Sequence, residues 1–240
     1  VSHLGWIVAA IGVGSPLGLA AALTHTLAHA LFKSSLFMLI GVVDHEAGTR
    51  DMRRLGKLYD KMPFTFVSTA VAAASTAAVP PLFGFVSKES ILDAFHESPY
   101  GMVLLIIAGF AAFLTFLYSL KIVFGAFVDG PKDMSGVHEA PVALWLPAAL
   151  PGWMSVVLPF MLFWVDNPVS AGVRAITGDD TFETPLALWH GVTPPFVVSL
   201  LVLVAGISFI FVRKPVFEAL RNKELLPANG PEVLSWTCLL

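Results

Sequence analysis

Long apolar runs separated by short polar stretches organise this chain. A helix needs about 20 apolar residues to cross the hydrocarbon of a bilayer, and several runs reach that length. The pattern predicts an all-α, polytopic transmembrane helix bundle with about six spans. The expected spans are 1–13, 17–43, 62–96, 102–128, 141–165 and 193–212, and the tail from 233 is a candidate for the start of one more.

The segment 62–96 is too long for one straight helix. Its roughly 35 residues would extend about 50 Å, whereas the hydrocarbon core is about 30 Å thick. Pro80, Pro81 and Gly84 interrupt it, and proline both removes a backbone donor and disfavours helix in the preceding residue. We therefore expect a discontinuous helix, with two halves joined by a non-helical stretch near 79–84.

Loop charge predicts the orientation of these spans. Cytoplasmic loops of membrane proteins carry an excess of lysine and arginine. Basic residues gather in loop 44–61 and after residue 212, whereas loop 166–192 holds four carboxylates and one basic residue. This alternation favours a single crossing of the plasma membrane by segment 62–96, because two crossings would invert the sides of both later loops. The expected sides are cytoplasmic for 44–61, 128–140 and 213–224, and external for 166–192.

Composition supports a membrane protein and gives little sign of other classes. Hydrophobic residues make up 56% of the 240 and charged residues only 13%, against about 25% charged in soluble domains. The net charge of −3 does not suggest nucleic acid as a partner, and one cysteine, Cys238, forms no internal disulfide. The chain begins and ends inside apolar runs, so we expect an internal piece of a longer protein. No phosphate-binding loop, metal-binding cysteine cluster or nucleophile motif is evident, which predicts no enzyme activity, cofactor or metal site.

The candidate chemistry lies inside the second span. His25, His29 and Lys33 are spaced by four residues, so they share one face of a helix. A charged side chain at the bilayer centre costs about 2.5 kcal/mol or more. Histidine changes protonation near neutral pH, and a lysine does so where burial disfavours its charged form. The stripe therefore predicts a proton relay, although a lone buried histidine also occurs as a packing residue.

Further ionisable residues lie beside the break and at the end of the second span. Lys88 follows the interruption and is expected to extend the relay; the alternative is a lysine that reaches to the interface. Its neighbour Glu89 points elsewhere and is expected to pair with another helix. Asp44, His45 and Glu46 stand at the mouth of the Lys33 helix, either as an entry funnel for protons or cations or as a solvated cap.

Three short motifs resemble one family. The run His29-Ala30-Leu31-Phe32-Lys33, followed by Leu36-Phe37-Met38, resembles the signature helix of the proton-conducting membrane transporters. That family comprises the antiporter-like subunits of respiratory complex I and the Mrp-type cation/proton antiporters. Gly84-Phe85-Val86-Ser87-Lys88-Glu89 resembles its second signature, on a discontinuous helix, and Ser2-His3-Leu4-Gly5 resembles a short element that opens the preceding helix.

The connector 44–53 resembles that of the A-type subunit of the Mrp antiporters. The resemblance implies the second half of an inverted-repeat antiporter fold over 1–130, followed by additional helices and loops over 131–240. It implies that Lys33 is the central and Lys88 the terminal proton-carrying lysine, with His25 and His29 bridging toward the first repeat.

The function implied by the resemblance is the membrane-embedded, proton-translocating part of a multisubunit Na⁺/H⁺ antiporter. Its partners would be the other subunits of that complex, the transported Na⁺ and H⁺, and the lipid bilayer. Two alternatives stay open at this point. One is a proton-pumping subunit of complex I, which would itself bind no flavin, iron–sulfur cluster or NADH. The other is a structural membrane subunit whose lysines are paired and inert.

Overall fold

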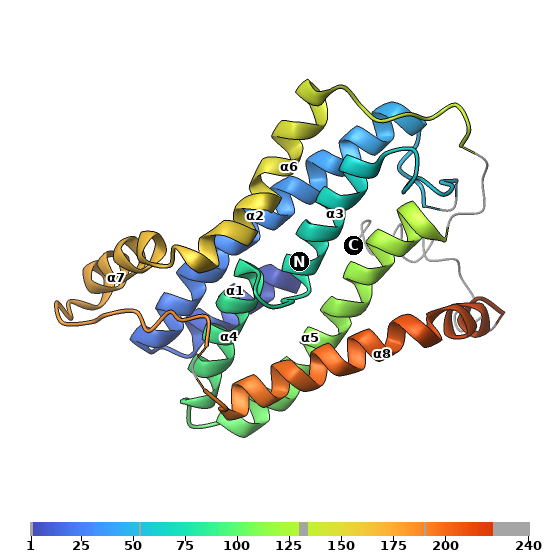
Figure 1. Cartoon of the computed structure of the whole chain (residues 1–240). Helices are drawn as coiled ribbons and strands as arrows, with labels where there is room; N and C mark the ends of the chain where they lie inside the picture. The colour runs from blue at the N-terminus through green and yellow to red at the C-terminus, as the bar shows by residue number, and fades with distance from the viewer. Residues whose placement is uncertain (1, 53, 130–133, 190, 223–240) are drawn as a thin grey trace, which may run out of the picture.

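A computed structural model describes residues 2–52, 54–129, 134–189 and 191–222, and every regular element in these ranges is helical (Figure 1). Val1, Arg53, the middle of loop 128–140, Cys238 and the candidate span from 233 therefore lie outside the described residues. The elements are α1 Ser2–Gly12, α2 Pro16–Ala47, α3 Pro63–Thr76, α4 Phe83–His96, α5 Gly101–Val123, the π-helical turn η1 Phe124–Val128, α6 Val142–Val157, the 3₁₀ turn η2 Leu158–Phe160, α7 Phe163–Thr177 and α8 Pro194–Asn222.

Four helical segments in the described ranges are long and apolar enough to span a membrane: 16–47, 101–128, 142–160 and 194–215. The short apolar helix α1 and the α3–α4 pair occupy the remaining expected spans. Local sequence accounts for the bounds of α2. Ser15 caps its first turn by accepting a hydrogen bond from the Gly18 amide, and Gly48 ends it in the left-handed conformation with φ 67°, which glycine adopts without a steric penalty.

The predicted break is present between Thr76 and Phe83. It lies slightly earlier than expected, because Gly84 belongs to the first turn of α4. A β-carbon at Gly84 would collide with the backbone carbonyl of Ser75 at the end of α3, and the Gly84 amide donates to the Ser75 hydroxyl at 3.2 Å. Gly84 therefore lets the two half-helices approach closely rather than forming the loop itself.

The α3–α4 pair crosses the bundle once. Both halves run in the same direction, and residues 54–62 and 134–141 lie together at one end of the molecule (Figure 1). At that end, the Leu58 amide donates to the Phe127 carbonyl at 3.0 Å. Arg213 pairs with Asp129 at 3.1 Å. This is the arrangement that a single crossing predicts.

Helix α2 forms the centre of the bundle, with α1, α3, α4, α6 and α7 packed around it. Small residues permit these contacts. Gly152 on α6 lies so close to Ser35 on α2 that a β-carbon would fall 2.7 Å from the Ser35 hydroxyl. That hydroxyl donates to the Ala148 carbonyl at 2.8 Å. Close approach at small residues and hydroxyl–backbone bonds between helices are the usual means of association in lipid.

Loop 166–192 is not a simple loop, which corrects the expectation from hydropathy. The preceding span ends at Phe160 rather than 165, and α7 occupies 163–177. Val165, Val169 and Val173 are buried at a spacing of four, as in an amphipathic helix. Asp166, next to Val165, helps to interrupt the apolar run, so a window that averages hydropathy does not detect the stripe.

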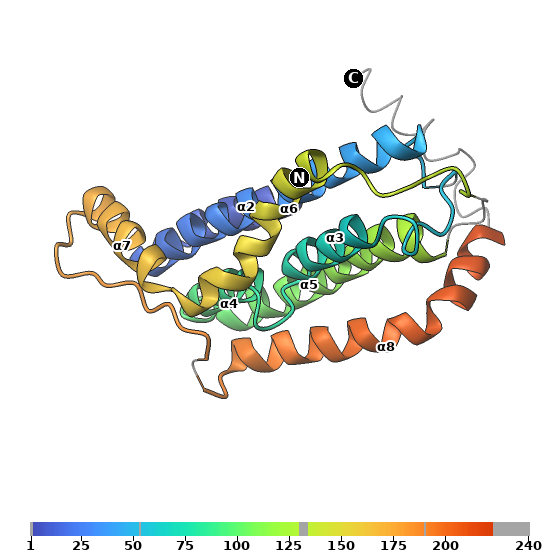
Figure 2. The same cartoon turned by 45° about the horizontal axis from the view of Figure 1, so that its top comes forward.

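Helix α8 also extends further than expected, to Asn222 instead of 212. The charged pair Arg213-Lys214 ends the apolar run but not the helix. Pro215 lies inside α8, which continues past it to Asn222, although proline removes the bond to the carbonyl four residues earlier and its ring crowds that carbonyl. Figure 2 shows α8 as a separate layer along α5, apart from the layer that contains α2 and α6.

Candidate functional site

His25 of α2 lies where α1, α2 and α4 meet. The side chain is fully buried, and both ring nitrogens have partners. Its Nδ1 lies 3.0 Å from the hydroxyl of Ser87 on α4. Its Nε2 lies 3.0 Å from Nδ1 of His3 on α1. The imidazole therefore links α1 to the broken helix, within this chain.

His3 continues the chain of hydrogen bonds. Its Nε2 lies 2.8 Å from the hydroxyl of Tyr118 on α5, so four side chains from four helices form an unbroken series. In one polarity, Tyr118 donates to His3, His3 donates to His25, and His25 donates to Ser87. The Ser87 hydroxyl then donates to the Gly84 carbonyl at 3.2 Å. Neutral imidazole has one donor and one acceptor nitrogen, so every group in the series is satisfied.

The reverse polarity is also available by the same inventory of donors and acceptors, although Ser87, with one hydroxyl proton, then no longer donates to the Gly84 carbonyl. Ser87 then donates to His25, His25 to His3, and His3 to Tyr118. A series of groups that can invert its donors and acceptors has the arrangement needed to pass one proton from end to end. We call Tyr118, His3, His25 and Ser87 the wire.

The two lysines contact aromatic rings beside the wire. The Lys33 Nζ lies over the Tyr118 ring, 5.3 Å from its centroid. Lys88 follows Ser87 in α4, and its Nζ lies 5.7 Å from the centroid of the Trp6 ring. Both distances suit a cation–π contact. Lys33 is half-buried and Lys88 is buried, 3% exposed.

His29 lies beside the wire rather than in it. It is half-buried, and its ring centroid lies 5.6 Å from that of His3 and 5.7 Å from that of Phe32. The predicted helix face of His25, His29 and Lys33 is therefore present. The hydrogen bonds that lead from His25 toward Lys33, however, run through His3 and Tyr118.

His3 and Tyr118 were not among the residues proposed from sequence for the relay. The signal for His3 was available, because an ionisable residue in an apolar run is a functional candidate by default. Tyr118 carries a weaker signal, since tyrosine near the end of a span usually marks the interface.

Glu89 is held by the last helix. Its Oε2 accepts a hydrogen bond of 2.6 Å from the hydroxyl of Ser199 on α8. The pairing with another helix is the one expected from sequence, and it ties α8 to the broken helix beside Lys88.

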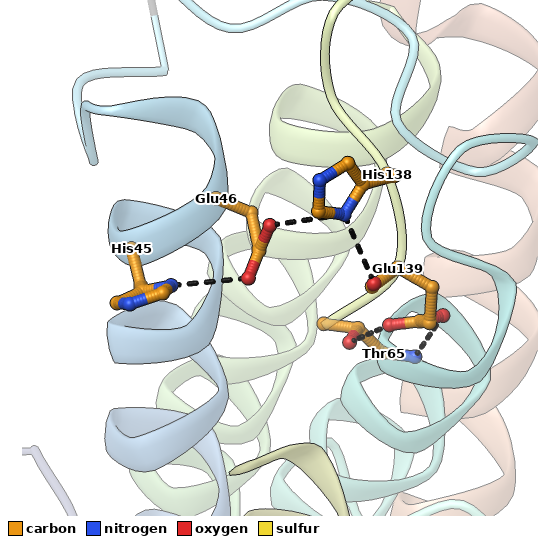
Figure 3. A network of polar contacts seen from close by, with 5 residues as sticks. All are labelled: His45, Glu46, Thr65, His138 and Glu139. Carbon is orange, nitrogen blue, oxygen red and sulfur yellow. Dashed lines mark hydrogen bonds and ion pairs between the residues drawn. The ribbon is translucent and has the colours of Figure 1, made fainter. Parts of the chain in front are cut away.

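The acidic and histidine residues at the end of α2 form a separate cluster (Figure 3). The Glu46 carboxylate lies between two histidines, 3.0 Å from Nδ1 of His45 and 3.3 Å from Nδ1 of His138. Glu139, next to His138, accepts from the Thr65 hydroxyl at 2.6 Å and from the first amides of α3. The cluster joins α2, α3 and loop 129–141.

These contacts favour a structural role for Glu46 over an open funnel. Glu46 is 13 residues beyond Lys33, which corresponds to about 20 Å along α2. Asp44 contributes its carbonyl to the Gly48 amide that ends the helix. Within the described residues, no group of three or more His, Cys, Asp or Glu side chains is arranged to hold a metal ion.

Comparison with known families finds a match over the first part of the chain. A family model described as "NADH:quinone oxidoreductase/Mrp antiporter, TM" matches residues 1–115. These residues belong to that family. The match contains α1 to α4 and most of α5, and thus three of the four residues of the wire and both lysines. Tyr118 and the helices from α6 onward lie beyond it.

Relatives over nearly the whole chain are antiporter subunits. The A-type subunit of the Na⁺/H⁺ antiporter of Alkalihalophilus pseudofirmus is 31% identical, over 95% of this chain and 32% of its own length. The probable A/B-type subunit of the K⁺/H⁺ antiporter of Rhizobium meliloti is 32% identical, over 94% of this chain and 24% of its own length. The chain therefore spans about a quarter to a third of the relatives that it matches.

Solved structures agree with this family. A chain in the structure of the Mrp complex from Dietzia sp. DQ12-45-1b is 41% identical and superposes with a TM-score of 0.79, over 99% of this chain and 26% of that one. A chain of the archaeal membrane-bound sulfane sulfur reductase, at 20% identity and a TM-score of 0.59, shares the fold alone. The all-helical membrane fold expected from sequence is thereby confirmed.

Proposed function

We propose that this chain is the membrane-embedded, proton-translocating part of a multisubunit monovalent cation/proton antiporter of the plasma membrane. The observation that carries the proposal is the wire, an unbroken series of hydrogen bonds inside the helix bundle, with Lys33 over the Tyr118 ring and Lys88 next to Ser87 along α4. A buried series of titratable groups is costly to maintain in a bilayer. Proton transfer is a function that accounts for keeping such a series despite this cost.

The relay residues in this proposal are Lys33, His29, His25 and Lys88, joined by His3, Tyr118 and Ser87. A proton that arrives at Tyr118 from the Lys33 side displaces the hydroxyl proton toward His3. Each later group then accepts one proton and releases another, and Ser87 releases a proton toward Lys88. The lysines connect to the two ends through bridging water, which transmits hydrogen bonds nearly as well as direct contact.

His29 acts on the relay through its contact with His3. The half-buried ring of His29 contacts His3, so its charge state alters the cost of placing a positive charge on that neighbour. Asp44, His45 and Glu46 act at the cytoplasmic end, where the Glu46 cluster fixes α2 against loop 129–141.

The division into 1–130 as the second antiporter repeat and 131–240 as added helices is supported by the end of the family match at 115.

The test uses everted membrane vesicles that carry the full-length transporter, energised to an acid interior. Addition of Na⁺ is expected to collapse the pH gradient, as measured with a fluorescent dye, because cation entry releases protons outward. K⁺ is added in a parallel sample, since the relatives include proteins named for either cation. If neither cation collapses the gradient and NADH oxidation builds it through Lys33, the chain belongs to a proton-pumping quinone oxidoreductase instead.

The sidedness of the loops gives an independent prediction. Thr177 is exposed at the end of α7, on the side expected to be external. In a Cys238→Ser background, Thr177→Cys is expected to react with a membrane-impermeant maleimide in intact cells. Lys57→Cys, in the loop at the opposite end, is the matched control and should react only in everted vesicles. Labelling of Thr177→Cys in everted vesicles alone would invert the proposed topology.

A further inference from the structure

The Lys88 side chain points into a small cavity. Its Nζ is buried and has no hydrogen-bond partner among the described residues. The cavity, of about 10 Å³, lies between the α3–α4 break, α5 and α8. Its lining includes Ala77 and Ala78 of the break, Ala112 of α5 and Ser199 of α8. Three elements therefore meet around one buried amine.

Helix α8 supplies the second polar group of this cavity. It is seated on α5 by glycines: a β-carbon at Gly206 would overlap the Phe116 ring, and one at Gly109 would lie 2.9 Å from a methyl group of Val198. This close packing brings Ser199 to the cavity, where its hydroxyl donates to Glu89 at 2.6 Å.

The cavity has the size and chemistry of a site for one water molecule. A buried water needs a volume of about 10–15 Å³ and two to four polar partners. The Lys88 amine and the Ser199 hydroxyl are such partners. A buried amine without a partner is costly, since it has lost its hydration, so a water that bonds to both groups is favoured here.

We propose that α8 completes the Lys88 site and that a water in this cavity joins Lys88 through Ser199 to Glu89. The inference rests on the proposed relay and extends it beyond Lys88. One N–H bond of the Lys88 ammonium breaks and the proton passes to the water. The water gives another of its protons to the Ser199 oxygen, and the serine gives its own hydroxyl proton to Glu89. An O–H bond forms at Glu89, the lysine becomes neutral, and water and serine are regenerated.

Two substitutions test this arm in the full-length transporter, assayed in everted vesicles and normalised to the assembled complex. Ser199→Ala removes the hydroxyl. Ala112→Val narrows the cavity while Ser199 and Glu89 both stay in the sequence. Both are expected to slow cation-driven proton exchange about 10-fold or more, since a lost proton-transfer group typically costs 10²–10⁴-fold. Ser199→Thr keeps a hydroxyl at this position, so its exchange rate should stay within about 2-fold of the wild-type rate.

Ser119→Ala is the matched control. Ser119 is buried on α5 and its hydroxyl bonds the Thr115 carbonyl of its own helix, so the same atom is lost without affecting the cavity. The exchange rate in D₂O distinguishes transfer from packing. In Ser199→Ala the ratio of the rates in H₂O and D₂O should rise above the wild-type ratio, whereas Ser119→Ala should leave it unchanged.

The outcomes separate this arm from the proposed function. Slow exchange in both cavity variants, with a raised isotope effect in Ser199→Ala, supports the arm. Wild-type rates in either variant overturn it, while loss of exchange in Lys88→Ala in the same vesicles keeps the relay. Normal exchange in Lys88→Ala overturns the relay, and the arm with it.

Discussion

Lys33→Ala is expected to abolish cation-driven proton exchange while the protein still inserts into the membrane. Lys33 is the lysine at the Tyr118 end of the wire, and alanine at this position cannot gain or lose a proton. Insertion should persist, since replacement of a lysine in a membrane helix removes an energetic cost of more than about 2 kcal/mol. The measurements are the dye signal in everted vesicles and the amount of assembled complex.

Lys121→Ala is the control for this experiment. Lys121 lies on α5 three residues after Tyr118 but is exposed, so its ammonium reaches toward the interface. It should transport within about 2-fold of wild type, as surface substitutions away from a site usually do. Retained exchange in Lys33→Ala would contradict the proposed proton relay. Loss of assembly with normal exchange per assembled complex would favour a purely structural role in the membrane.

His25→Phe is expected to lower exchange on the order of 100-fold, the range typical of a lost proton-transfer group. Phenylalanine preserves most of the ring volume in this fully buried position but provides neither nitrogen. The bonds to His3 and Ser87 are both lost, so the wire is cut in its middle. The buried Nδ1 of His3 loses its partner, at a cost of about 1–3 kcal/mol, which makes a measurement of assembled complex essential.

The matched control is His96→Phe. His96 is the last residue of α4 and is exposed, so the same substitution leaves the wire intact. His25→Asn is a second variant, since its amide both donates and accepts hydrogen bonds but does not titrate. If His25→Phe transports normally, protons pass between the lysines by another path and the wire is structural.

Hydropathy and the residues that begin, break or end helices predict much of the fold, because both act locally. The apolar lengths predict the helices, Pro80-Pro81 predict the break, and Ser15 and Gly48 mark the ends of α2. The single crossing of 62–96 also follows from sequence, since loop charge depends on residues close to each span. Helix α7 is the exception. Its stripe of valines is interrupted by polar residues and is recognisable only by its spacing.

The sequence by itself determined that His25, His29 and Lys33 share one face of a membrane helix, because the α-helical repeat relates residues four apart. Only the tertiary structure decided what that face meets. His3 and Tyr118 are 115 residues apart, and Glu89 and Ser199 are 110 apart. Such pairs depend on how each helix is rotated about its axis and how closely its neighbours approach at small residues such as Gly84 and Gly206. Those are properties of the packed bundle, whereas helical periodicity acts only within a few turns of one segment.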